Sequence, residues 1–84
     1  MESKEKKLLL DVEQGKECIV YRVNGQGGFR HRVMEMGFVR GEKVKVIKSA
    51  PLQDPIEYKI MQSHVSLRRT EAAHIEVVDV DELS

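Results

Sequence analysis

A succession of short β-type segments, separated by glycine- and proline-containing turns, is what most constrains the fold of this chain. Residues 43–49 and 56–60 show the pattern most clearly, because apolar and charged side chains alternate along them, as in strands with one buried face. Three more strands are predicted at residues 16–23, 64–67 and 74–80. Strands this short and this closely spaced favour a closed or nearly closed β-barrel, because closure removes the exposed edges of an open sheet.

One segment in the middle of the chain has helical periodicity instead. Phe29, Val33 and Met36 recur at the spacing i, i+4 and i+7, which places them on one face of a helix over residues 29–36. Gly37 follows at the position where a left-handed C-terminal cap is favoured. Because an isolated helix of about two turns is marginal in water, we expect this one to pack on the sheet.

Two shorter segments complete the expected fold. A single helical turn is predicted at residues 69–73, before the last strand, with Thr70 as its N-cap. Residues 8–12, the sequence LLLDV, form either a short strand or a leading arm that packs its leucines. The predicted fold class is therefore all-β, a small barrel with one short α-helix and one extra helical turn.

Length and composition indicate one small domain. The chain has 84 residues, of which 40% are hydrophobic and 33% charged, a balance typical of globular proteins. We expect a folded domain at residues 8–80, between a flexible N-terminus (1–7) and an acidic tail (81–84). No apolar run reaches the length of a signal peptide or of a membrane span. This predicts a soluble cytoplasmic protein without direct membrane insertion, and it leaves the oligomeric state open.

No recognised motif marks a catalytic, metal or cofactor site. The candidate metal ligands, Cys18, His31, His64 and His74, have none of the spacings found in known zinc motifs. The glycine-rich stretch before the helix lacks the lysine and hydroxyl residues of a phosphate-binding loop. We therefore expect no enzymatic activity, no metal and no cofactor.

The distribution of charge leaves a nucleic-acid interface as a weak alternative. The chain carries 14 basic and 14 acidic side chains, whereas nucleic-acid-binding domains usually have a basic excess. A basic strip is formed by Arg30, Arg32, Arg40, Lys43, Lys45 and Lys48. Barrels that bind single strands also stack bases on aromatic rings, and here only Phe38 and Tyr21 are expected to remain for that purpose. Nucleic acid is therefore not the expected partner.

The order of the segments resembles the FeoA family over roughly residues 8–78. The marks that carry this resemblance are Gly15, Glu35–Met36–Gly37, Gly41, Val44, Pro51, Asp54–Pro55, Leu67–Arg68, Glu71–Ala72 and Ile75–Val77. Val33 is a departure, because the family commonly has leucine at that position. The substitution keeps an apolar core residue.

The resemblance implies an SH3-like barrel that serves bacterial ferrous iron uptake as a non-enzymatic accessory protein. The implied partner is the cytoplasmic GTP-binding region of the FeoB permease, whose assembly or GTPase activity the chain would affect. An SH3-like module of a metal-dependent regulator is an alternative, because iron-dependent repressors contain the same barrel. We expect structural roles for Val33, Met36, Gly37, Gly41 and Val44. The predicted partner-binding residues are Arg30, Arg32, Phe38 and Arg40, and any of the three arginines is a candidate to assist GTP hydrolysis.

Overall fold

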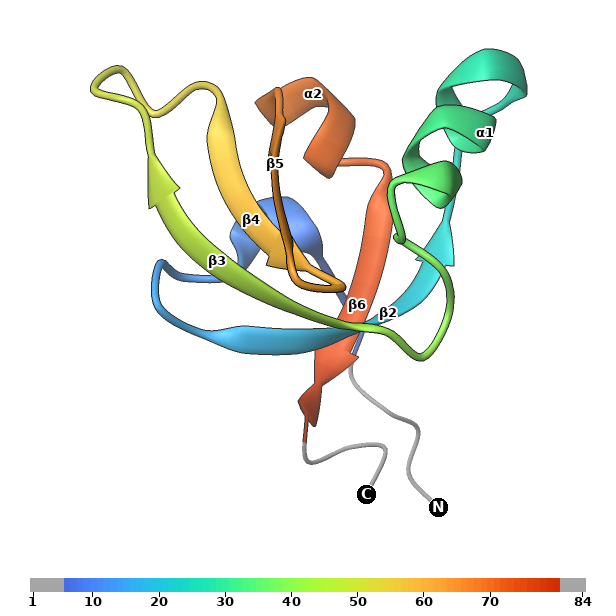
Figure 1. Cartoon of the computed structure of the whole chain (residues 1–84), viewed down its shortest axis with the longest axis horizontal. Coiled ribbons are helices and arrows are strands. Elements are labelled where there is room, and N and C mark those ends of the chain that lie inside the picture. The colour runs from blue at the N-terminus through green and yellow to red at the C-terminus, as the bar shows by residue number, and fades with distance from the viewer. Residues whose placement is uncertain (1–5, 81–84) are drawn as a thin grey trace.

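Six strands form one antiparallel sheet in the order β1-β6-β2-β3-β4-β5, which coils around a single core (Figure 1). The computed structural model describes residues 6–80, so the predicted acidic tail and most of the predicted flexible N-terminus lie outside the described residues. The elements are β1 (Lys7–Leu8), the 3₁₀ helix η1 (Leu9–Asp11), β2 (Glu17–Val23), α1 (Gly27–Glu35), β3 (Lys43–Ser49), β4 (Ile56–Ile60), β5 (Ser63–Leu67), α2 (Arg69–Ala72) and β6 (Ile75–Asp79).

The predicted all-β architecture with its short helix and extra helical turn is confirmed. The five predicted strands correspond to β2 to β6, and β3 and β4 have the predicted bounds. For residues 8–12 the sequence left open a short strand or a leading arm. In the structure β1 pairs only Lys7 with Val77 and Leu8 with Glu76, and η1 follows it. A two-residue strand has no periodicity of its own and forms because β6 offers it a free edge.

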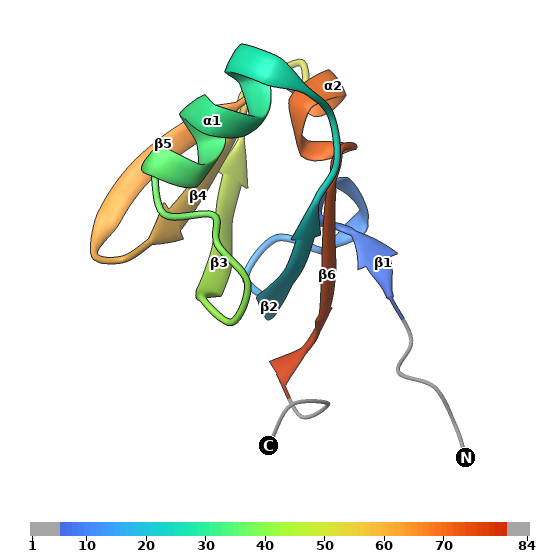
Figure 2. The same cartoon turned by 90° about the vertical axis from the view of Figure 1, so that its right-hand side faces the viewer.

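Strands β1 and β5 are the two edges of the sheet and do not pair with each other. The barrel is therefore closed by side chains and by a 3₁₀ turn. Helix η1 lies against β6 and α2, and its Leu9 is fully buried. The ends of β1 and β6 are also joined by an ion pair, in which Lys7 Nζ lies 3.2 Å from Asp79 Oδ1. Both α-helices lie at the same end of the barrel (Figures 1 and 2).

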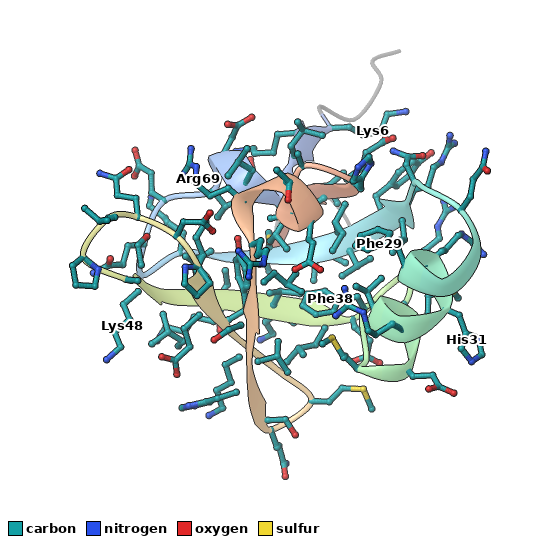
Figure 3. All side chains as sticks on the ribbon, turned by 90° about the horizontal axis from the view of Figure 1, so that it is seen from above. Lys6, Phe29, His31, Phe38, Lys48 and Arg69 are labelled. Carbon is teal, nitrogen blue, oxygen red and sulfur yellow. The ribbon has the colours of Figure 1, made fainter. Side chains whose placement is uncertain are left out.

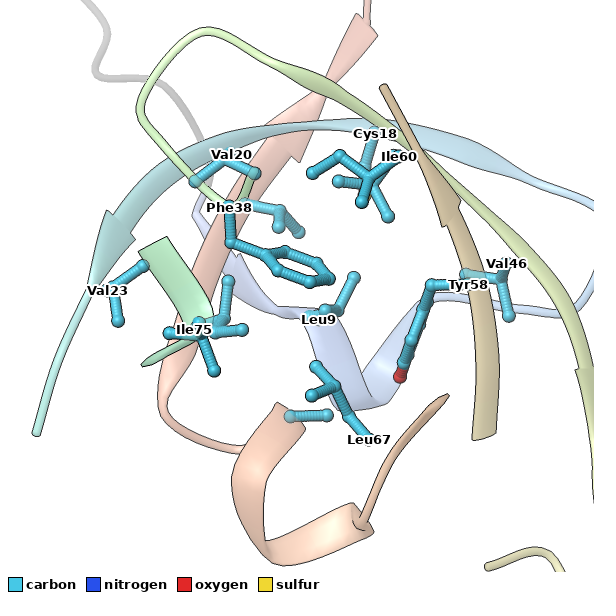
Figure 4. Close-up of a cluster of buried hydrophobic side chains, with 14 of the residues drawn as sticks. Leu9, Cys18, Val20, Val23, Phe38, Val46, Tyr58, Ile60, Leu67 and Ile75 are labelled. Carbon is cyan, nitrogen blue, oxygen red and sulfur yellow. The ribbon is translucent and has the colours of Figure 1, made fainter. Parts of the chain in front are cut away.

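The core is built from the inward faces of the strands, from Phe38 and from one residue of each helix, Leu9, Val33 and Ala72. The rings of Phe38 and Tyr58 meet edge to face with their centroids 6.4 Å apart (Figure 4). Alternation along β4 buries Ile56, Tyr58 and Ile60. Most of the core is aliphatic, as expected for a chain without tryptophan and with few aromatic residues. The core is therefore small, and its stability depends on tight packing of branched side chains.

Two irregularities bend the sheet. The register of β2 against β6 shifts between Val20 and Arg22, and the register of β3 against β4 shifts between Val46 and Lys48. Each shift is a β-bulge, which adds a residue to one strand, increases the local twist and redirects the side chain at the bulge. The extra residue in β2 is Tyr21.

Helix α1 begins at Gly27, two residues before the predicted start, and ends at a glycine cap. Gly37 has φ +115°, and its N–H donates to the carbonyl of Met34 at 3.1 Å. The N–H of Phe38 donates to the carbonyl of Val33 at 3.1 Å. These are the two hydrogen bonds of a Schellman motif, which commonly brings the residue after the glycine against the last turn of the helix. Phe38 is thereby directed into the core.

Helix α2 is capped by Glu71 and Asp54, and the prediction that Thr70 is its N-cap was wrong. The helix starts at Arg69, so Thr70 lies inside it. The Arg68 N–H donates to Glu71 Oε1 at 2.8 Å, and the Arg69 N–H donates to Asp54 Oδ1 at 2.9 Å. Asp54 belongs to the loop between β3 and β4, so a residue distant in sequence adds to the local cap that Glu71 provides.

Candidate partner-binding surface

Two of the predicted partner-binding arginines fasten helix α1 to the rest of the barrel. The Arg30 Nε–H donates to the carbonyl oxygen of Val23, the last residue of β2, at 3.2 Å. Arg32 donates to Glu71 in α2 and forms an ion pair with it. The Arg32 guanidinium also lies 5.9 Å from the centroid of the Phe29 ring. Both side chains therefore have intramolecular partners, which reduces what they can offer to another protein.

Phe38 is not part of an exposed surface, so its assignment to the partner-binding surface was wrong. Its exposed fraction is 0%. The physical reason is the Schellman cap at Gly37, which turns the chain inward and places the Phe38 ring against Tyr58. The periodicity of the helix does not extend to Phe38, so the sequence alone left its direction open.

Arg40 lies on Tyr21, where three cationic side chains surround a half-buried ring. The Arg40 guanidinium carbon is 4.5 Å from the Tyr21 ring centroid, and Lys6 Nζ is 4.7 Å from it. The Arg22 guanidinium is 5.7 Å away. Within residues 6–80 no carboxylate pairs with Arg40. We call Lys6, Tyr21, Arg22 and Arg40 the Tyr21 cluster.

The Tyr21 cluster has the chemistry of a site for an acidic group. The positive charges of Lys6 and Arg40 lower the pKa of the Tyr21 hydroxyl, because they favour its ionised form. The same charges would attract a carboxylate or another anion, to which the hydroxyl can donate a hydrogen bond. The sequence did not reveal this cluster, because Lys6 and Arg40 are far apart in the chain and meet only after the β2 bulge has redirected Tyr21.

The candidate metal ligands are not brought together. His31 Nε2 lies 3.1 Å from Glu35, and His64 Nδ1 lies 3.0 Å from Glu57. The His74 ring packs against Phe29. Cys18 is buried, and burial raises the pKa of its thiol to about 12. In the part of the chain that the structure describes, no three ligating side chains converge as a metal site would need.

Most of the residues expected to be structural lie in or beside the core, and Gly41 lies in an exposed turn. Val33 and Val44 are buried, and Met36 is the C-cap of α1. Gly41 has φ +95°, in the turn that leads into β3. The Gly41 N–H donates to the carbonyl of Val20 at 2.9 Å, which ties this turn to β2.

Among residues 6–80, none of the helices combines the length and the apolar composition that a bilayer crossing requires.

Coiled antiparallel strands around a core filled by side chains define a small β-barrel domain of the SH3-like type. The sequence model of the FeoA domain family matches residues 7–79. The chain belongs to the FeoA family.

Three relatives with similar sequences or structures can be compared with this chain. The chain is 49% identical over 69 residues to the Fe(2+) transport protein A/Fe(2+) transporter FeoB fusion protein of Porphyromonas gingivalis (strain ATCC BAA-308 / W83). That match covers 82% of the chain but only 8% of the fusion protein. The solution structure of the FeoA protein from Chlorobium tepidum is 36% identical, with a TM-score of 0.83 over 88% of this chain and 70% of that one.

The third relative supports the fold alone. Stenotrophomonas maltophilia FeoA complexed with zinc, described as a prokaryotic SH3 domain protein, is 24% identical. The two structures superpose with a TM-score of 0.76 over 84% of this chain and 88% of that one. The predicted SH3-like fold is thus confirmed, and the link of the family to ferrous iron transport is confirmed with it.

Proposed function

We propose that this chain is a cytoplasmic accessory protein of ferrous iron uptake and that it acts by contact with the cytoplasmic GTP-binding region of a FeoB-type permease. The observation that carries the proposal is the fusion relative, in which a 49% identical sequence is joined to a FeoB transporter in one polypeptide. Fusion keeps two proteins together at a high effective concentration, as suits partners that work in contact.

The Tyr21 cluster is the surface that we assign to this contact. Tyrosine and arginine are enriched among the residues that contribute most to protein–protein binding. Here Arg40 is already held against the Tyr21 ring, so less side-chain freedom is lost when a partner binds. Arg30 and Arg32 play an indirect part, because they hold α1 and the following turn in position.

A binding titration tests the assignment. We expect the purified cytoplasmic region of the permease from the same organism to bind the chain, and Tyr21→Ala or Arg40→Ala to weaken binding by about tenfold or more. Lys48→Ala is the matched control, since Lys48 is an exposed cation on β3 outside the cluster, and it should change the affinity less than twofold, roughly 0.4 kcal/mol. Wild-type binding that is absent, or equal losses in all three variants, would contradict the proposal.

Arg40 also supports a finer proposal, in which the contact changes GTP hydrolysis by the permease. An arginine supplied by a second protein can stabilise the charge that develops on the transferred phosphoryl group. Arg40 fits this role better than Arg32, which is paired with Glu71. GTP turnover by the permease region should rise when the chain is added and fall back with Arg40→Lys, which keeps the charge and loses the planar guanidinium. Unchanged turnover with intact binding would favour a role in assembly.

A further inference from the structure

Three lysines gather on the outer face of the sheet, where β3 begins and β4 ends. Lys45 of β3 and Lys59 of β4 are direct cross-strand partners, and Lys43 lies two residues before Lys45. The intervening Val44 and the neighbouring Ile60 point into the core, so the lysines must lie on the opposite, exposed face. Like charges placed directly opposite each other destabilise a sheet.

Little on this face offsets the repulsion. Glu17 of β2 is the cross-strand partner of Lys45, but its carboxylate lies 4.0 Å from Lys43 Nζ, at the limit of an ion pair. Across residues 6–80, neither Lys45 nor Lys59 takes part in an ion pair.

The turn between β4 and β5 is strained at the same place. Met61 has φ +51° and Gln62 has φ +68°, and Ile60 pairs with Ser63 across this two-residue loop. Two-residue hairpin loops with both φ values positive are usually made by Asn-Gly or Asp-Gly, because other side chains are strained there. Met61 is also 59% exposed, so part of its apolar surface is open to a ligand.

These unfavourable features surround one hollow of about 280 Å³, which is lined by Glu17, Lys43, Lys45, Lys59, Met61 and Gln62. The lysine repulsion and the strained turn each lower folding stability. Strain and unfavourable charge that gather in one place are typical of a functional site. The hollow therefore has the properties of a binding site whose residues are kept for a ligand.

We propose that this lysine hollow binds an acidic segment of a protein partner, with carboxylates against Lys43, Lys45 and Lys59 and an apolar side chain against Met61. Charge complementarity argues for an acidic ligand, and the flexible thioether of Met61 suits an apolar side chain of variable shape. A nucleic acid fits less well, because the hollow contains no aromatic ring for stacking and the chain has no basic excess. This inference rests on the proposed function, because it assumes that the partner is the cytoplasmic region of the permease.

A pair of matched variants separates binding from stability. Lys59→Gln removes the repulsion with Lys45, so it should raise the melting temperature while weakening binding by about fivefold, roughly 1 kcal/mol. Lys48→Gln is the control and removes the same charge from another exposed position. The cross-strand partner of Lys48 is the acidic Glu57, so this substitution removes an attraction and not a repulsion. It should lower the melting temperature slightly and leave the affinity unchanged. A residue with a purely structural role would not produce this opposite pattern.

A change to the turn gives a second, independent readout. The double substitution Met61→Asn and Gln62→Gly introduces the preferred residues for this turn and removes the exposed thioether. We expect weaker binding with little change in the melting temperature, because the preferred turn residues offset the lost contact between the Met61 thioether and Gly37. An unchanged affinity would overturn the role of Met61 in the hollow.

Three probes distinguish failure of this inference from failure of the proposed function. The probes are the permease region, a short synthetic peptide of glutamate and leucine, and single-stranded RNA. Binding of the permease region that Lys59→Gln does not weaken overturns the inference and leaves the proposed function intact. Binding of the acidic peptide alone, weakened by Lys59→Gln, supports the hollow and overturns the proposed function. Binding of neither protein ligand, or RNA binding that Lys59→Gln abolishes, overturns the inference.

Discussion

Gly37 fixes the position of two other residues because it has no side chain. A Cβ atom built there would lie 2.7 Å from Met61 Sδ, and the residue has φ +115°. The glycine therefore lets Met61 pack over the end of α1 and lets the cap direct Phe38 inward.

Gly37→Ala should accordingly lower the free energy of unfolding by about 1–2 kcal/mol or more, from backbone strain and the displaced Met61 side chain. Urea denaturation followed by circular dichroism measures this difference. Gly28→Ala is the control, because Gly28 lies in α1 with nothing within 4 Å of an added Cβ. It should leave the stability unchanged or raised, and equal losses in both variants would refute the argument.

The environment of some residues could be predicted from the sequence, and that of others could not. Val33 and Val44 were placed correctly in the core, because periodicity reports which face of an element is buried. Phe38 was assigned to the wrong environment, because its direction depends on two backbone hydrogen bonds at a cap. Tyr21 was seen only as a remaining aromatic residue, because its cations come from other parts of the chain.

At the scale of elements, Glu71 connects the two helices. One carboxylate oxygen accepts the Arg68 N–H and the other pairs with Arg32 of α1. The backbone hydrogen bond from Arg68 is the main cause that lowers the pKa of Glu71, and the hydrogen bond from Arg32 adds to it. A carboxyl with a lowered pKa in the folded state stabilises the fold above its ordinary pKa, and the contribution is lost as the pH falls through the folded value.

Glu71→Gln should therefore lower stability at neutral pH by about 1 kcal/mol. The loss should shrink on acidification below about pH 4.5, the ordinary value of this group, because the wild type then loses the same interaction. Thermal unfolding measured from pH 3 to pH 7 gives both curves. A difference that stays constant over this range would show that charge on Glu71 is irrelevant.

The strands illustrate which elements a sequence specifies locally. Residues 43–49 and 56–60 alternate strongly enough to fix their own bounds. Strand β1 depends instead on the edge of β6, and one of the two cap hydrogen bonds of α2 depends on Asp54 from another loop. Local pattern thus predicted the elements and their order, while pairing partners and caps required the folded chain.

For the whole molecule, the small core makes closure of the barrel important. Leu9 is fully buried where η1 lies against β6 and α2. Leu9→Ala should cost about 2–5 kcal/mol, a large part of the roughly 5–15 kcal/mol of a typical domain. Leu52→Ala is the control, because Leu52 is 89% exposed and should change the stability by less than about 0.5 kcal/mol. Similar denaturation midpoints for the two variants would mean that η1 does not close the barrel.

The formal net charge of the whole molecule is zero, but its charged side chains are unevenly distributed. Figure 3, seen from above, shows charged side chains all around the barrel, with Lys6 and Lys48 on different sides of it. The basic strip expected from the sequence is therefore divided between the Tyr21 cluster, the lysine hollow and the arginines that hold α1, and Lys48 lies outside all three. Only the folded arrangement separates side chains available to a partner from those already engaged.

The pairing of β1 with β6, reinforced by Lys7 and Asp79, has a consequence for how the domain can be attached to a larger protein. The described chain starts and stops in neighbouring strands, so a tether at either terminus leaves from one end of the barrel, opposite the helices (Figure 2). For a joined copy at an effective concentration of about 1 mM, a dissociation constant of roughly 10–50 μM suffices for nearly continuous contact, whereas a free copy must reach the same occupancy through affinity or abundance.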